Sequence, residues 1–431
     1  MPSIVEWEER MDSPAFRAVF DRLYGSEVSS QEQQIDRYRR LLSRFGGRFG
    51  AAEVQLISVP GRTEIGGNHT DHNHGRVLAA AIHLDAIAAV AAADDHQVVL
   101  DSIGYAEDIR VNLDDLHLRP SERGTTAALV RGIAARFQAL GHQIGGFRAC
   151  LHSHVGIGSG LSSSAAIEVL IAAIFNILYN QSRIAAEELA KIGQLAENNY
   201  FGKPCGLMDQ MTCAVGGVVA IDFRNPQQPE ITRVEADLAA AGFSLVVVDS
   251  GGHHADLTED YAAIPREMRT VAEALGGKNL RDIEPAHFDA HLAGLRSRVG
   301  DRALLRALHF FGDNQRVLDQ IIALREGRLD DFIRMVGESG LSSGRWLQNS
   351  FSPSEPREQG INLALALTEE FIRKNGCRGG CRVHGGGFAG TILAILPSAL
   401  LPVYAKEMQV LFGDKCLTVL RIRSVGVFVW L

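Results

Sequence analysis

The segment GIGSGLSSSAAIEVL, residues 156–170, places three glycines and three serines at the start of an apolar run. Glycine has no side chain, so the backbone at 156, 158 and 160 could approach a ligand closely. The serines at 162–164 would lie over a first helical turn, whose N–H groups have no partner within the helix. Such a helix start binds anions such as phosphate. The same residues could equally form a glycine turn and an ordinary serine cap.

A second segment, VPGRTEIGGNHTDHNHG at residues 59–75, is dense in distinct polar groups. They include Arg62, Glu64, Asn68, His69, Asp71, His72, Asn73 and His74. Many short donors and acceptors suit recognition of a polyhydroxylated ligand. The H-x-D-H-x-H spacing also offers metal-ligand types, and a polar surface loop would have a similar composition. All three interpretations stay open from the residues alone.

Two further segments combine glycine with residues that could do chemistry. In AENNYFGKPCGLMDQMT (196–212), Glu197 lies near the end of a helix and Asp209 follows a glycine turn. An Asp in such a place is commonly only a turn or cap residue. In CRVHGGGFAGTILAIL (381–396), three consecutive glycines precede an apolar strand. Glycines there indicate that the backbone closely approaches another group.

Strands and helices alternate along the chain and would position these segments. Short β-branched runs predict strands at 55–59, 217–222, 245–249, 391–396 and 417–422. Periodic apolar positions predict helices at 29–45, 162–179, 184–200, 261–275, 302–325 and 359–374. The first of these helices opens with a capping-box pattern, Ser29 and Glu32. This alternation predicts an α/β or α+β protein.

Composition restricts the class of protein. A chain of 431 residues, 46% hydrophobic and 22% charged, is long enough for two domains. A net charge of −8 without a basic tract argues against a nucleic-acid partner. The apolar stretches 77–93 and 165–179 contain charged or polar residues and are shorter than the ~20 residues of a membrane helix. The N-terminus does not look like a signal peptide. We therefore expect a cytoplasmic protein, without membrane partners, whose six scattered cysteines are reduced thiols.

Together the four segments resemble the galactokinase branch of the GHMP small-molecule kinases. The polar segment is similar to the family's GRxNLIGEHTDYN, and GLSSSAA matches the family directly. AENNYFGKPCGLMDQ is similar to AENxxVGxPCGIMDQ, and GGGFAG to GGGFGG before a strand. The similarity extends from about Tyr38 to the C-terminus.

The resemblance implies a role for each matching position. Asp209 would be the catalytic carboxylate, as general base or electrostatic stabiliser, with Arg62 keeping it ionised. Ser164 and Glu197 would hold Mg²⁺. The sugar would lie among Asn68, His69, Asp71, Gly206 and Tyr261. The ATP phosphates would lie against Gly156, Gly158, Ser159, Gly160, Leu161, Ser162, Ser163, Ser164, Ala165 and Gly386.

The resemblance also implies an α+β, two-domain GHMP kinase fold with the active site in the inter-domain cleft. We expect an N-terminal extension over 1–37, an N-terminal domain over 38–225 and a C-terminal domain over 226–431. The polar, proline-bearing stretch DFRNPQQPE (222–230) marks the boundary between the two domains. The implied activity is an ATP-dependent sugar 1-kinase, with ATP as co-substrate, Mg²⁺ as cofactor and galactose as the first choice of substrate. The oligomeric state stays open, with a monomer favoured.

Several positions depart from the family pattern. Glu64 stands for Asn, Asn68 for Glu, His72 for Tyr, Gly156 for Pro, His384 for Thr or Ser, Ala389 for Gly and Thr126 for a Trp near adenine. Because the sugar-facing positions differ most, galacturonate or N-acetylgalactosamine are alternative substrates. A non-catalytic sugar sensor is a further alternative. It is disfavoured because Ala165 and Ala166, just after the serines, are intact.

Overall fold

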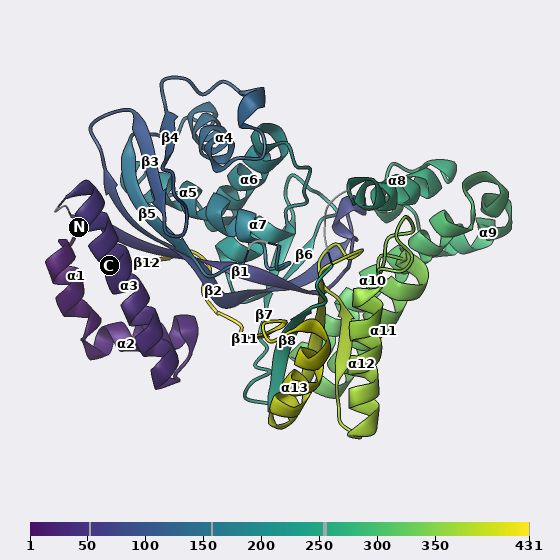
Figure 1. Ribbon diagram of the computed structural model, residues 1–431. Helices are drawn as coiled ribbons and strands as arrows, with labels where there is room; N and C mark the ends of the chain where they lie inside the picture. The colour runs from purple at the N-terminus through teal and green to yellow at the C-terminus, as the bar shows by residue number, and fades with distance from the viewer. Residues whose placement is uncertain (51–52, 157, 253–256, 431) are drawn as a thin grey trace.

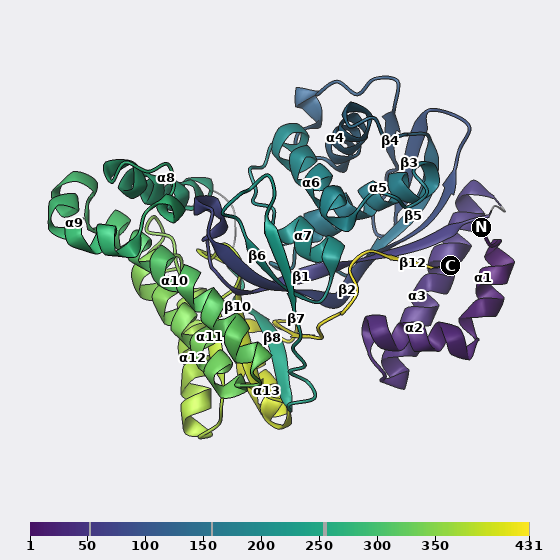
Figure 2. The same ribbon diagram turned by 180° about the vertical axis from the view of Figure 1, so that it is seen from behind.

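The computed structural model describes residues 1–50, 53–156, 158–252 and 257–430. Ile157 of the predicted phosphate segment and the side chain of Ser29, the predicted capping serine, fall outside the described parts. Two β-sheets organise the fold, one in each half of the molecule (Figures 1 and 2). In these parts no helix is long and apolar enough to cross a membrane.

The first sheet is built around one long strand, β2 (Arg76–Ala92). Along its length β2 pairs with β1 (Gln55–Gly66). Its second half also pairs with β5 (Phe147–Ser153), and its first half with β6 (Val218–Asp222). The remaining strands are β3 (Gln97–Ser102), β4 (Ile109–Asn112), β7 (Glu230–Val234) and β12 (Phe428–Val429). The central strands β1 and β2 thus connect every part of this sheet.

Helices cover both faces of the first sheet. One face packs on α4 (Thr126–Ala139), α5 (Ser163–Tyr179), α6 (Ala186–Ala196) and α7 (Met208–Val215). Side chains alternate between the faces along β2, as a pleated strand requires: Ala88 and Val90 join the core under α5, and Ile87 and Ala89 join the core under the N-terminal helices. Because both faces are buried, the strand is apolar throughout and its alternation is hidden in the sequence.

The second sheet has the order β11-β8-β10-β9, with all neighbours antiparallel. It comprises β8 (Phe243–Asp249), β9 (Gly380–Val383), β10 (Thr391–Pro397) and β11 (Leu417–Leu420). Its outer face packs on α12 (Gly360–Lys374) and α13 (Leu401–Phe412). Its inner face joins α11 (Leu329–Ser342) in the core of the first sheet. The helices α8 (Thr258–Ala274), α9 (Pro285–Val299) and α10 (Asp301–Arg325) form an arm beyond it (Figure 1).

The two ends of the chain meet on the first sheet. Helices α1 (Ile4–Met11), α2 (Pro14–Tyr24) and α3 (Val28–Phe49) surround the C-terminal tail. Phe16 stacks on Trp430 with ring centroids 4.1 Å apart, and the Trp430 indole N–H donates to the Tyr38 hydroxyl at 3.2 Å. The N-terminal helices therefore belong to the same core as β1, β2 and β5.

These findings revise the expected boundaries. Helix α3 begins at Val28, ahead of the boundary predicted at 37/38. The boundary predicted at 225/226 falls between β6 and β7, which pair in the first sheet. The C-terminal tail returns to that sheet as β12, beside β1. The polar stretch 222–230 is thus a turn within one sheet, since a polar, proline-bearing sequence suits a turn as well as a linker.

A buried ion cluster fastens these ends to the sheet. The Asp85 carboxylate on β2 accepts hydrogen bonds from Arg37 at 2.5 Å, Arg423 at 3.1 Å and the Tyr24 hydroxyl at 2.6 Å, and all are buried. Burial alone would raise the pKa of Asp85, but the two guanidinium groups hold that pKa below its ordinary value. One carboxylate therefore joins α2, α3, β2 and the C-terminal tail.

The Asp85→Asn variant should lose about 3 kcal/mol or more of the free energy of unfolding, because two buried arginines lose their counter-charge. Urea unfolding monitored by tryptophan fluorescence measures this loss. Asp12→Asn is the matched control, since Asp12 pairs with Arg39 at the exposed surface and should cost less than about 1 kcal/mol. A loss below about 1 kcal/mol for Asp85→Asn would show that the cluster does not fasten the chain ends.

Candidate active site

Arg62 on β1 and Asp209 on α7 form a two-point ion pair. The Arg62 Nε donates to Asp209 Oδ1 at 2.7 Å, and Nη2 donates to Oδ2 at 2.6 Å. The third guanidinium nitrogen donates to the Gly160 carbonyl at 2.5 Å. The Arg62 side chain is 8% exposed and that of Asp209 is 31% exposed. The buried Arg62 guanidinium group thus fixes the Asp209 carboxylate, which stays partly exposed.

Two local features bring Arg62 to this place. The pairing of β1 with β2 is irregular between Pro60 and Arg62, and such bulges re-aim side chains. A Cβ at Gly61 would lie 2.7 Å from the Leu161 carbonyl oxygen. Glycine at 61 therefore lets β1 lie directly against the loop that precedes α5.

Asp209 carries a negative charge at neutral pH. Its burial by itself would raise the pKa, but Arg62 and a hydrogen bond from the Ser162 hydroxyl hold the pKa of Asp209 below its ordinary value. A carboxylate whose pKa lies below its ordinary value is a weaker proton acceptor than a free one. The arrangement suits a carboxylate that orients a hydroxyl by accepting its hydrogen bond.

The glycine-serine loop is not an ordinary helix cap. Ser162 precedes α5 in a left-handed conformation with φ of 63°, and its side chain makes no capping hydrogen bond. Its hydroxyl donates to Asp209. Gly160 also has positive φ, and a Cβ there would lie 2.8 Å from the Thr391 hydroxyl oxygen. The cap interpretation therefore fails for Ser162, and the N–H groups at the start of α5 stay available to an anion.

The remaining residues of the glycine-serine loop differ in which of their atoms could reach a ligand. Ser159 folds back, its hydroxyl donating to the Gly156 carbonyl at 2.6 Å. Leu161 and Ala165 have buried side chains, so only their backbone could reach a ligand. Ser163 is the first residue of α5, and Gly158 has a positive φ of 76°. The expected phosphate segment is thus continuous in space with the Arg62–Asp209 pair.

Ser164 and Glu197 lie side by side with oxygen atoms of the kind that Mg²⁺ binds, and Lys203 Nζ also lies 3.5 Å from Glu197 Oε1. The Ser164 hydroxyl donates to Glu197 Oε1 at 3.1 Å, and the Gln210 amide donates to Glu197 Oε2 at 2.9 Å. Mg²⁺ prefers oxygen ligands and is commonly held by one or two carboxylates plus substrate phosphates. No cluster of three His, Cys, Asp or Glu side chains suited to a metal occurs within the described ranges. Any ion here would therefore need oxygen atoms from a ligand.

Of the expected sugar residues, His69 and Tyr261 contact the glycine loop 385–387, and Asp71 lies against Gly206. A Cβ at Gly206 would lie 2.1 Å from Asp71 Oδ2, so glycine is needed for this approach. The His69 Nε2 lies 2.9 Å from the Gly386 carbonyl oxygen, and the Tyr261 hydroxyl donates to the Gly387 carbonyl at 2.9 Å. Gly386 was expected to face ATP, yet it lies against His69 and Tyr261.

One ring nitrogen of His69 finds no hydrogen-bond partner in the described part of the chain. Burial lowers the pKa of His69 to about 3, so its ring is neutral. Because Nε2 faces a carbonyl, it carries the proton, and Nδ1 is a hydrogen-bond acceptor. Nδ1 is buried and has no partner among the described residues.

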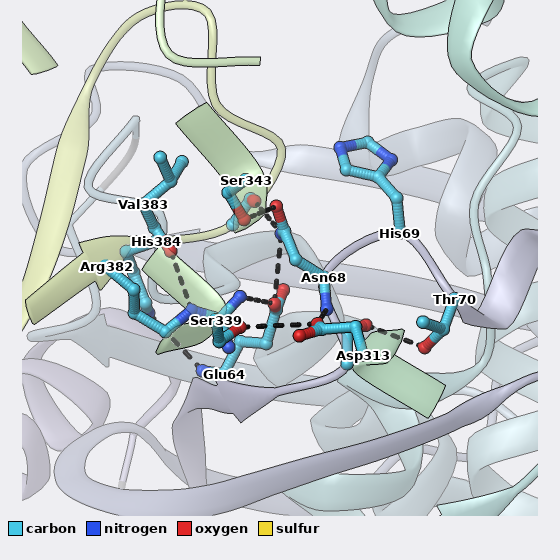
Figure 3. A network of polar contacts seen from close by, with 12 residues as sticks. Glu64, Asn68, His69, Thr70, Asp313, Ser339, Ser343, Arg382, Val383 and His384 are labelled. Atoms are coloured by element: carbon cyan, nitrogen blue, oxygen red, sulfur yellow. Dashed lines mark hydrogen bonds and ion pairs between the residues drawn. The ribbon is translucent and has the colours of Figure 1, made fainter. Parts of the chain in front are cut away.

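Asn68 differs from the expectation of a direct sugar contact. Its amide donates to Glu64 Oε1 at 3.0 Å and to the Gly385 carbonyl at 2.8 Å, and its oxygen accepts from Asn349 at 2.8 Å and from Ser343 at 3.3 Å. The side chain is fully buried, and these bonds use all its donors and acceptors. Figure 3 shows Asn68 within this network and the His69 ring pointing away from it.

Behind Asn68, Glu64 forms a buried ion pair with Arg382 of β9. Burial raises the pKa of Glu64, although Arg382 opposes this effect. Arg382, Asn349 and Gln210 have no role in the sequence analysis. Arg382 and Gln210 share one signal that could have found them: a polar side chain inside an otherwise buried strand or helix.

Comparisons with known proteins agree with this geometry. Residues 128–217 match the model of the GHMP kinases N terminal domain, and residues 43–92 match the galactokinase galactose-binding signature. The chain is 32% identical over 379 residues to a galactokinase of Glaesserella parasuis, covering 85% of this chain and 92% of the relative. It is 32% identical over 375 residues to a galactokinase of Streptomyces coelicolor, covering 86% and 92%.

Solved structures share the fold. The crystal structure of Lactococcus lactis galactokinase complexed with galactose matches with a TM-score of 0.77 and 23% identity, over 90% of this chain and 98% of that one. Methanococcus jannaschii mevalonate kinase matches with a TM-score of 0.61 and 15% identity, over 86% and 99%. The expected α+β fold is confirmed. The chain belongs to the galactokinase family, a family of ATP-dependent sugar phosphotransferases within the GHMP kinases.

Proposed function

We propose that this protein transfers the γ-phosphoryl group of ATP to the 1-hydroxyl group of galactose. The observation that carries the proposal is the two-point Arg62–Asp209 pair. It connects the loop before α5, through Gly160 and Ser162, to the start of α7, just after Gly206, which lies against Asp71. A phosphate held by α5 and a sugar held beside Asp71 would meet at this carboxylate. A cytoplasmic, monomeric protein that uses Mg²⁺ is part of the same proposal.

The residues present suit each part of the transfer. Asp209 would accept a hydrogen bond from the anomeric hydroxyl and orient its oxygen toward the phosphorus. Arg62 keeps Asp209 ionised and places positive charge near the transferred group. Ser164 and Glu197 would hold Mg²⁺, which supplies positive charge to the phosphate oxygens. Positioning and electrostatic stabilisation account for most of the catalysis in such transfers.

The relatives favour galactose over galacturonate as the substrate, because the chain is 32% identical to galactokinases over most of its length. The intact Arg62–Asp209 pair favours catalysis over a sensor role.

Asp209→Asn should lower kcat by roughly 10²–10⁴-fold, because the amide carries no negative charge. The galactose Kd should stay within a few-fold. A coupled ADP-release assay gives kcat, and calorimetry gives Kd. Asp289→Asn, an exposed position on α9, is the control and should keep full activity. More than a tenth of the wild-type rate in Asp209→Asn would rule out Asp209 as the catalytic carboxylate.

Glu197→Gln should raise the Mg²⁺ concentration for half-maximal rate by about tenfold, because Mg²⁺ prefers charged oxygen ligands. The galactose KM should change by less than about twofold. Ser164→Ala should act in the same direction but more weakly, since it removes a neutral ligand. Magnesium titrations of the rate measure both, with Glu187→Gln, an exposed residue of α6, as control. A raised galactose KM at unchanged Mg²⁺ dependence would refute the metal assignment.

A further inference from the structure

Glu64 and Asn68 lie on the sugar side of the site, yet neither side chain is open to solvent. The Glu64 side chain is 5% exposed, the Arg382 side chain is 0% exposed, and they pair across the two sheets, from β1 to β9. A buried charge is tolerated only when it is paired and hydrogen-bonded. Arg382 also donates to the Val383 carbonyl at 3.0 Å. The pair therefore fixes β1 against the strand that leads into glycines 385–387.

The Glu64 carboxylate decides how the Asn68 amide is oriented. Because Glu64 Oε1 is an acceptor, the Asn68 NH₂ must face it, at 3.0 Å. The second amide hydrogen then bonds the Gly385 carbonyl at 2.8 Å, and the amide oxygen is left to accept from Asn349 at 2.8 Å. A reversed amide would bring its oxygen against the carboxylate of Glu64. One charge thus sets every hydrogen bond of the Asn68 side chain.

The same bonds reach the ligand-facing side through the glycine loop. Asn349, held by the Asn68 oxygen, also donates to the Gly386 carbonyl at 3.1 Å. His69 contacts that carbonyl through Nε2 at 2.9 Å and has a left-handed backbone with φ of 58°. The Gly386 carbonyl is therefore held by Asn349 of the network and by His69 at the same time.

We propose that Glu64 is a positioning residue which, together with Asn68 and Arg382, holds His69 and the glycine loop 385–387 in the geometry that binds the sugar. This inference rests on the proposed function for the identity of the sugar. In this arrangement Glu64 and Asn68 act as one unit, because the carboxylate at 64 requires an amide donor at 68. A carboxylate at both positions would put two like charges within about 3 Å in a buried site.

The proposal reverses an expectation drawn from sequence. With Asn68 facing the sugar, Asn68→Glu would leave galactose phosphorylation unchanged or improve it. In the network, the new carboxylate meets Glu64, so Asn68→Glu alone should be harmful. Replacing Glu64 by Asn at the same time removes the repulsion between residues 64 and 68, restores an amide–carboxylate pair and leaves Arg382 as the counter-charge. The hydrogen bond to the Gly385 carbonyl stays lost, because a carboxylate at 68 has no donor. The double exchange should therefore rescue the single exchange in part.

A double-mutant cycle tests this coupling with four proteins: wild type, Asn68→Glu, Glu64→Asn and the double variant. Each single change should lower kcat/KM for galactose by roughly tenfold or more, chiefly through KM, with the ATP KM within about threefold. The double variant should have a kcat/KM for galactose roughly tenfold above that of Asn68→Glu, without reaching wild type. Glu370→Asn, whose carboxylate pairs with Arg373 at the exposed surface, is the control and should change neither KM.

A second readout does not depend on turnover. The thermal midpoints of the four proteins report the coupling of residues 64 and 68 in folding stability. The increase of each midpoint on adding galactose reports their coupling in sugar binding. If an Asn68→Glu protein is too unstable to assay, Glu64→Gln, which removes the charge but keeps an acceptor oxygen, replaces it as the single change. It should raise the galactose KM and reduce the galactose-induced thermal shift.

The possible outcomes test separately the coupling of residues 64 and 68 and the identity of the sugar. Double-variant losses equal to the product of the single losses would overturn the coupling, as would equal increases of the galactose and ATP KM. A wild-type protein that does not phosphorylate galactose would overturn the proposed substrate. In that case the thermal midpoints of the four proteins still decide whether residues 64 and 68 act together.

Discussion

The pairing of Arg62 with Asp209 is the constraint to which the rest of the site conforms. A guanidinium group that is almost fully buried must have a counter-charge close by, or it would cost several kcal/mol. Asp209 supplies that charge, and the Gly160 carbonyl takes the remaining donor. These bonds bring β1, the loop before α5 and the start of α7 to one point. The glycine-serine segment 156–170 and the polar segment 59–75, which are far apart in the sequence, therefore meet at this pair.

Strand β1 carries a second buried ion pair two residues further on, at Glu64. Arg62 turns toward α7, and Glu64 turns toward Arg382 in the second sheet. Adjacent side chains of a strand point to opposite faces, so residues 62 and 64 lie on the same side of β1. The pairing of β1 with β2 is irregular before Arg62 and after Glu64, and such irregularities change the direction of side chains. The Arg62–Asp209 pair of β1 thus lies within the first half of the molecule, and the Glu64–Arg382 pair joins β1 to the second sheet. Asp85 on β2 serves the chain ends in the same way.

The sequence predicted helices and strands whose apolar residues follow a regular local period. It missed strand residues that are buried on both faces of the sheet or that carry buried charges. The helices at 162–179, 302–325 and 359–374 lie within one residue of α5, α10 and α12. The strand predicted at 55–59 continues to Gly66, because charged residues that pair in the interior look like a loop in the sequence. The 17-residue strand β2 has no counterpart among the predicted strands, since its alanine-rich run is buried on both faces and shows no alternation.

The site was only partly predictable. Arg62 and Asp209 are 147 positions apart, so no local pattern could bring them together, and the family motifs alone suggested the pairing. The motif also placed Asn68 at the sugar, because it carries no information on the partners Glu64, Asn349 and Gly385 that occupy the amide.

The most direct test of the account follows the phosphoryl group itself. Incubation of the protein with ATP, Mg²⁺ and [1-¹³C]galactose, followed by ³¹P and ¹³C NMR, identifies the bond that forms. The account predicts a phosphorus signal coupled to ¹³C at position 1 and one ADP for each sugar phosphate. ATP hydrolysis without a sugar phosphate, phosphate on another carbon, or no turnover at all would contradict it.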